Sequence, residues 1–253
     1  MMKSISSRQN AWFKRLRDAI REHRDEIVIE GPKAVRDAIA AGWKPIAIAV
    51  GVGQAILPVP ADGQAILPVS ADGQARLPVL QLTRELIDAL SETRTPQKVL
   101  GLFERPQPSI DFTSTRPVVA LDAVQDPGNV GTIVRLAAAF DAAGVVLLPG
   151  CADAFAPKAI RASAGAILSV PVMEMTIDGL PSRPLFYADA GGDAIAPPQG
   201  ATLVFGSEGQ GVSDAVRARG RAIAVATSGR VESLNVAASA AILLWQAFRS
   251  PAS

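Results

Sequence analysis

The stretch LVFGSEGQG at residues 203–211 joins a short, continuously apolar run to a loop with three glycines. Apolar residues in succession, rather than in alternation, indicate a strand buried on both faces, as in a parallel sheet covered by helices. Glycines allow unusual backbone conformations and let a ligand approach the main chain closely. The stretch therefore predicts a buried strand that carries a ligand-binding loop at its carboxyl end. It is not a Walker A loop, since no Gly-Lys-Ser/Thr follows, and its spacing differs from the dinucleotide fingerprint.

Similar apolar runs occur on both sides of this stretch, and helical patterns lie between most of them. The runs occupy residues 118–121, 145–148, 185–187 and 223–225. Alternation of buried strands with helices predicts a mostly parallel α/β sheet. We expect one such domain over residues 117–253, with its chemistry in the loops that follow the strands.

Two further loops follow this pattern. DPGNVGTIVR, residues 126–135, leaves a strand and enters a helix, for which Asn129 is the expected N-cap. Arg135 lies off the apolar stripe of that helix; it is either a solvated charge or, beside a Gly/Pro/Asn loop, an anion-binding group. The third loop, at residues 231–236, enters a helix that is apolar almost all round, which indicates a core helix or a homodimer interface.

The first part of the chain, residues 1–105, has a different pattern. Helices are expected at 10–22, 33–41 and around Leu86, with strands at 27–29, 46–50, 80–82 and 99–103. Basic residues are concentrated before residue 25 and include Arg8, Lys14 and Arg15. Such a cluster suits contacts with phosphates, although a solvated helix face would have the same composition.

Two segments interrupt the pattern of strands and helices. Residues 53–79 hold a ten-residue repeat that contains Gly and Pro, in three copies that begin GQAILPV, GQAILPV and GQARLPV. Proline within each short apolar run argues against a central strand, so we expect an inserted, flexible surface loop. Residues 106–116 are rich in Pro, Ser and Thr, which is typical of an interdomain linker.

Composition excludes several kinds of protein. One cysteine, Cys151, permits no internal disulfide and no cysteine metal cluster, and one histidine, His23, argues against a catalytic triad or zinc site. We therefore expect no metal. No segment approaches the roughly 20 apolar residues of a membrane span, and the basic N-terminus lacks the apolar run of a secretory signal. A cytoplasmic location is expected.

Three motifs taken in order, DPGNVGTIVR, LVFGSEGQGVS and VESLNVAASAAILL, resemble the signature motifs of the SpoU/TrmH family of RNA ribose 2′-O-methyltransferases, part of the SPOUT superfamily. The resemblance covers residues 117–249. ISSRQNAWFKRLR (5–17) and IVIEGPKAV (27–35) look more loosely like the small RNA-binding domain of many members.

The resemblance implies a trefoil knot in the sheet domain and S-adenosylmethionine as methyl donor. By motif match, Gly206, Gly209, Val225, Leu234 and Asn235 are expected to surround this cofactor, largely through backbone atoms. The family usually has Ile-Pro-Met where residues 225–227 read Val-Ala-Thr, so we expect the adenine pocket to differ in detail.

The matching catalytic set is Asn129, Arg135, Glu208, Ser233 and Asn235. Family proposals let the arginine activate the ribose hydroxyl. Because arginine is hard to deprotonate, we expect Arg135 to position the ribose and stabilise developing negative charge instead. Lys158 and Arg161 match a stretch near RNA, where a structural turn is equally expected. The resemblance also implies a homodimer, with ribosomal RNA favoured over transfer RNA as substrate.

Two alternatives remain from the sequence. One is a non-catalytic RNA-binding or ribosome-assembly protein of the same fold, which would not need Arg135, Glu208 and Asn235 together. The other is an unrelated nucleotide-dependent α/β enzyme such as a dehydrogenase, against which the absence of a phosphate fingerprint argues.

Overall fold

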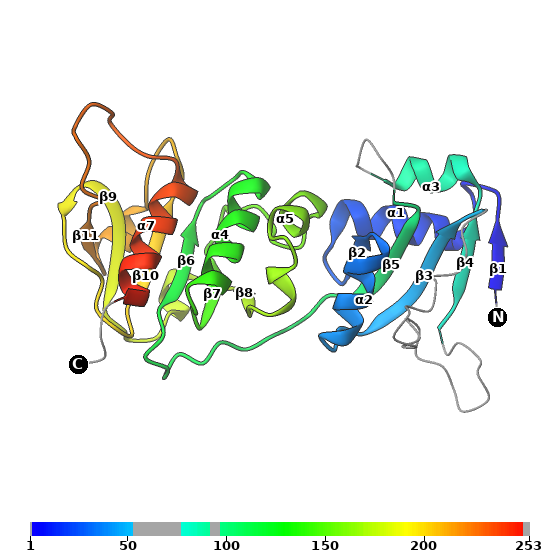
Figure 1. The fold of residues 1–253 in the computed structure, drawn as a ribbon, viewed down its shortest axis with the longest axis horizontal. Helices are drawn as coiled ribbons and strands as arrows, with labels where there is room; N and C mark the ends of the chain where they lie inside the picture. Colours follow the sequence, from blue (N-terminus) through cyan, green and yellow to red (C-terminus); the bar gives the residue numbers. More distant parts are fainter. Residues whose placement is uncertain (1, 53–76, 92–96, 250–253) are drawn as a thin grey trace. The chain divides into compact units, whose positions relative to one another are not determined.

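A computed structural model describes residues 2–52, 77–91 and 97–249. The chain forms two compact units, Met1–Pro106 with Phe155–Pro157, and Gln107–Ala154 with Lys158–Ser253 (Figure 1). Nearly all of the repeat predicted as a loop at 53–79 lies outside the described residues. Among these residues, no helix is long and apolar enough to cross a bilayer.

The first unit is a five-stranded sheet in the order β1-β4-β3-β5-β2, in which β1, β4 and β3 are parallel and β5 is antiparallel to both β3 and β2. Its elements are β1 (Met2–Ile5), α1 (Ala11–Glu22), β2 (Glu26–Glu30), α2 (Pro32–Ala40), β3 (Pro45–Gly51), β4 (Val79–Leu82), α3 (Arg84–Leu90) and β5 (Val99–Glu104). All the elements expected from the sequence are present. The edge strand β1 was not predicted.

Helices cover both faces of this sheet. Asn10 caps α1, and its side chain accepts a hydrogen bond from the Trp12 N–H at 2.9 Å. The apolar faces of α1 and α3 pack on one face of the sheet, where Phe13, Leu16 and Ile87 are buried. On α2, Val35 is fully buried and lies close to Gly101 of β5. The helical spacing read from the sequence thus marks the buried faces.

The second unit contains a six-stranded sheet in the order β11-β9-β10-β6-β7-β8, in which all pairings are parallel. This confirms the α/β class. The elements are β6 (Val118–Asp122), α4 (Pro127–Ala139), β7 (Gly144–Leu147), α5 (Pro157–Ala162), η1 (Ala166–Leu168), β8 (Val172–Glu174), η2 (Ile177–Gly179), β9 (Leu185–Asp193), β10 (Thr202–Gly206), α6 (Asp214–Arg217), β11 (Arg221–Ile223) and α7 (Val236–Arg249). The three-residue strand β8 was not predicted, and β11 ends before Val225.

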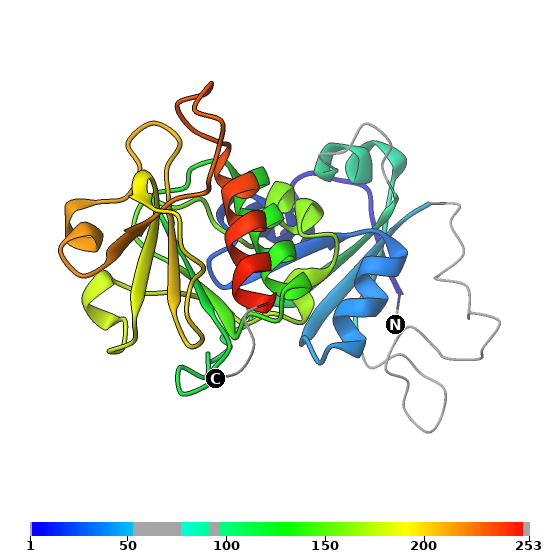
Figure 2. The ribbon, with the colours of Figure 1, turned by 60° about the vertical axis from the view of Figure 1, so that its left-hand side comes forward.

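Two long helices, α4 and α7, lie side by side on one face of this sheet (Figures 1 and 2). The opposite face is covered by α6, by η2 and by the segment around Ile110, which is buried within the core. Residues after Gln107 therefore belong to the second unit, although no helix or strand begins before Val118. Alternate residues of β6 face the two layers, which explains why residues 118–121 of this strand are all apolar.

The register of the central strands creates a crevice at the carboxyl edge of the sheet. β10 pairs with β6 up to Gly206 and Asp122, but it pairs with β9 only as far as Val204 and Tyr187. Beyond Tyr187, β9 parts from β10. A crevice at such a point in an open parallel sheet is where ligands bind. The trefoil knot stays a prediction.

Candidate active site

A pocket of about 340 Å³ lies where β9 and β10 part. This volume is within the range of small-molecule sites. Five segments line the pocket: the end of β9, the glycine-rich loop after β10, α6, the end of β11 with the residues after it, and the loop before α7 with the start of that helix. The lining residues are Ala188, Asp189, Ala190, Phe205, Gly206, Ser207, Glu208, Gln210, Gly211, Arg217, Ile223, Val225, Thr227, Val231, Glu232, Ser233, Leu234, Val236 and Ser239.

The glycine-rich loop is a tight five-residue turn. Ser207 N–H donates to the Gly211 carbonyl at 3.0 Å, and Gly211 N–H donates back to the Ser207 carbonyl at 2.9 Å. A Cβ on Gly206 would lie 2.1 Å from the Gly211 carbonyl carbon, so only glycine fits at this position. Gly211 has φ +68°, which also favours glycine. The glycines noted in the sequence thus serve the turn itself as well as the pocket wall.

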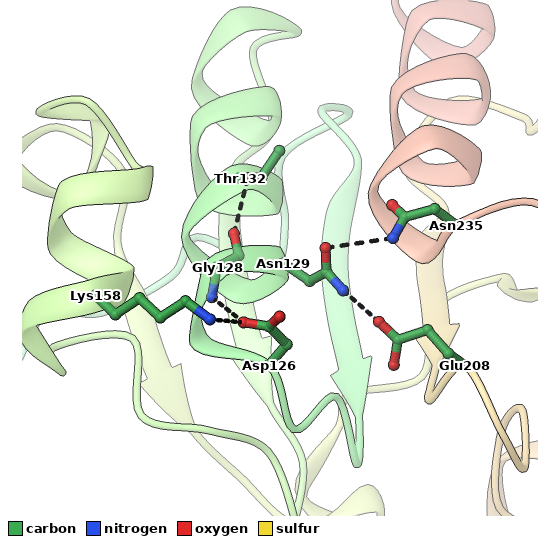
Figure 3. A network of polar contacts seen from close by, with 7 residues as sticks. All are labelled: Asp126, Gly128, Asn129, Thr132, Lys158, Glu208 and Asn235. Carbon is green, nitrogen blue, oxygen red and sulfur yellow. Dashed lines mark hydrogen bonds and ion pairs between the residues drawn. The ribbon is translucent and has the colours of Figure 1, made fainter.

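Beside the pocket, three polar side chains from separate segments form a connected network (Figure 3). The Asn129 amide donates to Glu208 Oε1, and Asn235 Nδ2 donates to Asn129 Oδ1 at 3.5 Å. Asn235 Oδ1 accepts the N–H groups of Ala237, at 2.9 Å, and Ala238, and so caps α7. The ends of β6, of β10 and of the segment before α7 are thereby tied together.

The start of α4 differs from the sequence prediction. The helix begins at Pro127, and its N-cap is Asp126, whose side chain accepts the Gly128 N–H at 2.6 Å. Lys158 lies 2.7 Å from the same carboxylate, and its hydrogen bond, together with that of Gly128, holds the pKa of Asp126 below its ordinary value. The prediction of Asn129 as N-cap is wrong, because Asp126 caps the helix one turn earlier. This leaves the Asn129 side chain free to contact Glu208.

Most of the predicted site residues fall into two groups. Gly206, Glu208, Val225, Ser233 and Leu234 line the pocket. Asn129 and Asn235 adjoin it through the network with Glu208.

Two predicted site residues, Arg135 and Gly209, lie outside both groups. Gly209 lies on the loop but does not line the pocket. Arg135 is exposed on α4 and makes no hydrogen bond or ion pair with any residue that the structure describes.

The residues expected to contact RNA lie on both units. Arg8 and Lys14 are exposed and have no ion-pair partner within the described part of the chain. Arg15, in contrast, already has partners within the chain. Its guanidinium donates to Glu26, and this hydrogen bond raises the pKa of Arg15. The same guanidinium lies 5.2 Å from the centroid of the Trp12 ring. On the second unit, Lys158 pairs with Asp126, and Arg161 is exposed on α5.

Sequence reasoning missed an ion pair in the pocket wall. Arg217 of α6 and Asp189 of β9 both line the pocket, and their side chains lie 3.1 Å apart. The bond to Asp189 raises the pKa of Arg217 above its ordinary value. Asp189 closely follows the apolar run at 185–187, at the carboxyl edge of the predicted sheet, so its position in the sequence could have indicated a site residue. Arg217 lies in a four-residue helix with no distinguishing pattern.

A second cavity, of about 540 Å³, lies beyond the ends of β7 and β8 and includes Cys151. The thiol donates to the Leu121 carbonyl at 3.1 Å, and burial raises its pKa. In residues 2–52, 77–91 and 97–249, no three His, Cys, Asp or Glu side chains gather as a metal site would require.

A family model described as the SpoU rRNA Methylase family matches residues 116–245. The chain belongs to this family. A second model, described as the MRM3-like substrate binding domain, matches residues 14–101 of the first unit. The two matches correspond to the two resemblances drawn from sequence motifs, and they confirm the SpoU assignment.

Relatives and solved structures agree with this membership. The chain is 35% identical to 23S rRNA (guanosine(2553)-2'-O)-methyltransferase RlmP of Bacillus subtilis, over 65% of this chain and 70% of that protein. It is 30% identical to an uncharacterized tRNA/rRNA methyltransferase of Synechocystis, over 97% and 93% of the two chains. An AdoMet-bound rRNA methyltransferase from Sinorhizobium meliloti superimposes with a TM-score of 0.81 at 25% identity, covering 98% of each chain.

Proposed function

We propose that this protein transfers a methyl group from S-adenosylmethionine to a ribose 2′-hydroxyl of ribosomal RNA, with the cytoplasm as its expected location. The observation that carries the proposal is the pocket between β9 and β10, bordered by the Asn129–Glu208–Asn235 network. The pocket offers room for a nucleoside-sized cofactor. The network provides the fixed polar groups that a group-transfer site requires.

The lining of the pocket fits the proposed cofactor. Gly206 has no side chain, so its backbone lines the pocket directly, while Val225 and Leu234 supply apolar surface for an adenine. Of the four charged residues that line the pocket, Arg217 is paired with Asp189, which leaves the carboxylates Glu208 and Glu232 in excess. An excess of negative charge favours a cationic ligand. When bound, S-adenosylmethionine supplies an electrophilic methyl group on a positively charged sulfur.

The other groups of the site orient the RNA. Asn129 holds Glu208 through its amide, and Asn235 holds Asn129 from the opposite side. An arginine guanidinium is a poor general base, so we assign Arg135 the task of binding the ribose and its phosphate and stabilising charge on the 2′-oxygen. Ser233 lines the pocket and shapes its mouth.

The exposed position of Arg135 supports a site shared between two subunits. Arg135 lies on α4, which packs beside α7, and α7 exposes Trp245 and Phe248 by 45% and 57%. Phe140, the C-cap of α4, lies against Phe248, with ring centroids 6.1 Å apart, so the apolar surface extends from α7 to the end of α4. We propose that this surface pairs two copies of the chain, and that Arg135 of the partner subunit completes each site.

Ribosomal RNA is the preferred substrate for two reasons. RlmP, one of the relatives above, is a 23S rRNA methyltransferase, and the first unit matches a substrate binding domain of the MRM3 type. The exposed Arg8 and Lys14 of that unit offer positive charge for phosphate contacts.

The test uses purified protein, methyl-labelled S-adenosylmethionine, and unmodified ribosomal and transfer RNA, followed by alkaline digestion. A 2′-O-methyl group blocks cleavage at its own linkage, so label in alkali-resistant dinucleotides of ribosomal RNA is expected. Label confined to mononucleotides would mean base methylation and would refute the proposed reaction. Label in transfer RNA alone would refute the proposed substrate. RNA binding without cofactor binding would favour the non-catalytic alternative.

The shared site is tested by combining two inactive variants, Arg135→Ala and Glu208→Gln. If Arg135 acts in the partner's site, a mixed dimer contains one site with both residues intact. Random pairing of the two variants then restores about a quarter of wild-type activity, because about half of the dimers are mixed and each has one intact site. No recovery from verified mixed dimers would show that Arg135 acts within its own subunit.

A further inference from the structure

The ion pair between Arg217 and Asp189 is placed where two walls of the pocket meet. Asp189 lies on β9, beyond the last residue that pairs with β10, and Arg217 ends α6, shortly after the glycine-rich loop. Both side chains are only partly exposed, 39% for Arg217 and 31% for Asp189. Neither residue belongs to the network of Asn129, Glu208 and Asn235.

The guanidinium of Arg217 contacts three residues, two on β9 and one directly after the glycine-rich loop. One terminal nitrogen donates to Asp189 at 3.1 Å, and Nε donates to the Val212 carbonyl at 3.3 Å. The guanidinium carbon also lies 5.6 Å from the centroid of the Tyr187 ring, on the same strand as Asp189. Asp189 is itself fixed, since it accepts the Gly191 N–H at 2.9 Å. A planar guanidinium with several donors can make such contacts together, whereas a lysine cannot.

The contact with Val212 reaches the loop that carries Glu208. Val212 is buried and directly follows Gly211, which closes the loop through its two hydrogen bonds with Ser207. A shift of Val212 would therefore move the closed turn as a unit, and Glu208 with it. β9 and β10 no longer pair at this level, so the sheet does not fix the width of the crevice at this point.

We propose that Arg217 is a positioning residue that, through Asp189, fastens the glycine-rich loop to β9 and so sets the position of Glu208 and the width of the cofactor pocket. This inference rests on the proposed function, because it assumes that the pocket holds S-adenosylmethionine. Partly exposed ion pairs contribute little to folding stability. The role of the pair is accordingly geometric.

The chain offers a matched control in a second ion pair, Arg221 with Asp193. This pair joins β11 to the same strand β9, its atoms lie 2.6 Å apart, and neither residue lines the pocket. Arg221→Ala therefore removes an arginine–aspartate pair from the same strand without touching the site. Any effect of losing charge or a surface ion pair in general appears equally in this variant.

The experiment compares wild type, Arg217→Ala, Asp189→Asn, the double variant and Arg221→Ala in the full-length protein. Calorimetry gives the dissociation constant of S-adenosylmethionine, single-turnover assays give the methylation rate, and filter binding gives RNA affinity. We expect Arg217→Ala to weaken cofactor binding and to slow methylation by about tenfold each, as for loss of a coupled contact. RNA affinity and thermal unfolding should match those of Arg221→Ala.

A double-mutant cycle distinguishes positioning from direct contact. If Arg217 acts through Asp189, Asp189→Asn alone has the same kind of effect, and the double variant is no worse than Arg217→Ala. Additive losses would overturn the proposal, since Arg217 would then contact the cofactor independently. Unchanged cofactor binding and rate in both single variants would overturn it as well. A wild-type protein that fails to bind S-adenosylmethionine would instead refute the proposed function.

Discussion

Replacing Gly206 with alanine tests whether the glycine-rich loop depends on close backbone packing. A Cβ at this position would lie 2.1 Å from the Gly211 carbonyl carbon, 2.3 Å from its oxygen and 2.4 Å from the Val212 nitrogen. All three are backbone atoms, so no side-chain rotation can relieve the overlap. The closed turn itself has to move away from β10.

The expected cost follows from this geometry. Overpacking of a well-packed interior destabilises by about 1–3 kcal/mol, and a backbone clash belongs at the upper end of that range. At about 2–4 °C per kcal/mol for a chain of this size, the unfolding temperature should fall by about 6–12 °C. Displacement of Glu208 by about 1 Å should also slow methylation by about a hundredfold.

Gly209→Ala in the same loop is the matched control. No heavy atom lies within 4 Å of a Cβ built on Gly209, and this residue does not line the pocket. Its unfolding temperature, cofactor affinity and methylation rate should stay close to those of wild type. Calorimetric unfolding and single-turnover assays well below the transition measure both variants. If Gly206→Ala behaves like Gly209→Ala, close packing against the Gly211 backbone is not what requires glycine at position 206.

Three further predictions concern other parts of the second unit. Asn235→Ala should lower the free energy of unfolding by about 1 kcal/mol, because α7 loses its cap. Asn235→Asp should keep the cap and yet lose methylation activity, because a carboxylate cannot donate a hydrogen bond to Asn129. Thermal unfolding combined with methylation assays separates the two effects. Trp245→Glu combined with Phe248→Glu should convert a dimer into a monomer in sedimentation experiments, since both side chains are exposed on α7; an unchanged mass would place the interface elsewhere. Cys151, the single cysteine, should react with iodoacetamide more slowly in the folded protein than in urea, because burial raises the pKa of its thiol and the thiolate is the nucleophile. For the same reason, the increase of the alkylation rate with pH should occur at a higher pH in the folded protein than in urea. The raised pKa also means that folding stability falls as pH rises above the ordinary thiol pKa of about 8.5; equal alkylation profiles in the two states would contradict this account.

Much of the architecture could be predicted because buried parallel strands leave a strong signal. The continuous apolar runs at 118–121 and 203–205 indicated strands covered on both faces, and β6 and β10 are central in the sheet. Once the strands were assigned, the loops that follow them had to meet at one edge. The resemblance to the SpoU family then singled out Asn129 and Glu208 in these loops, 79 positions apart, and the two side chains are in contact in the structure.

Shorter elements and caps were harder to predict because several residues compete for the same role. β1 (MKSI) and β8 (VME) have four and three residues, and polar or charged residues occupy part of each, so neither shows the continuous apolar run that identified the equally short β7 (GVVL). At the start of α4, Asp126 and Asn129 are both good capping residues, and the sequence does not say which is used. Pro127 suits the first helical position, and it therefore favoured Asp126.

The position of Arg135 follows from helix geometry and bears on how the site works. Asn129 lies in the first turn of α4 and contacts Glu208, whereas Arg135, six residues later, is rotated by about 240° around the helix axis. The two side chains therefore leave the helix in directions about 120° apart, the shorter way round, and that of Arg135 is exposed. A single chain thus contains the part of the site proposed to hold the methyl donor, which is the pocket and the Asn129–Glu208–Asn235 network. Its Arg135 side chain, however, is exposed on the surface of α4. If Arg135 is needed for methyl transfer, a second copy of the chain or the RNA itself must meet it at that surface, and the mixed-dimer experiment decides between these two.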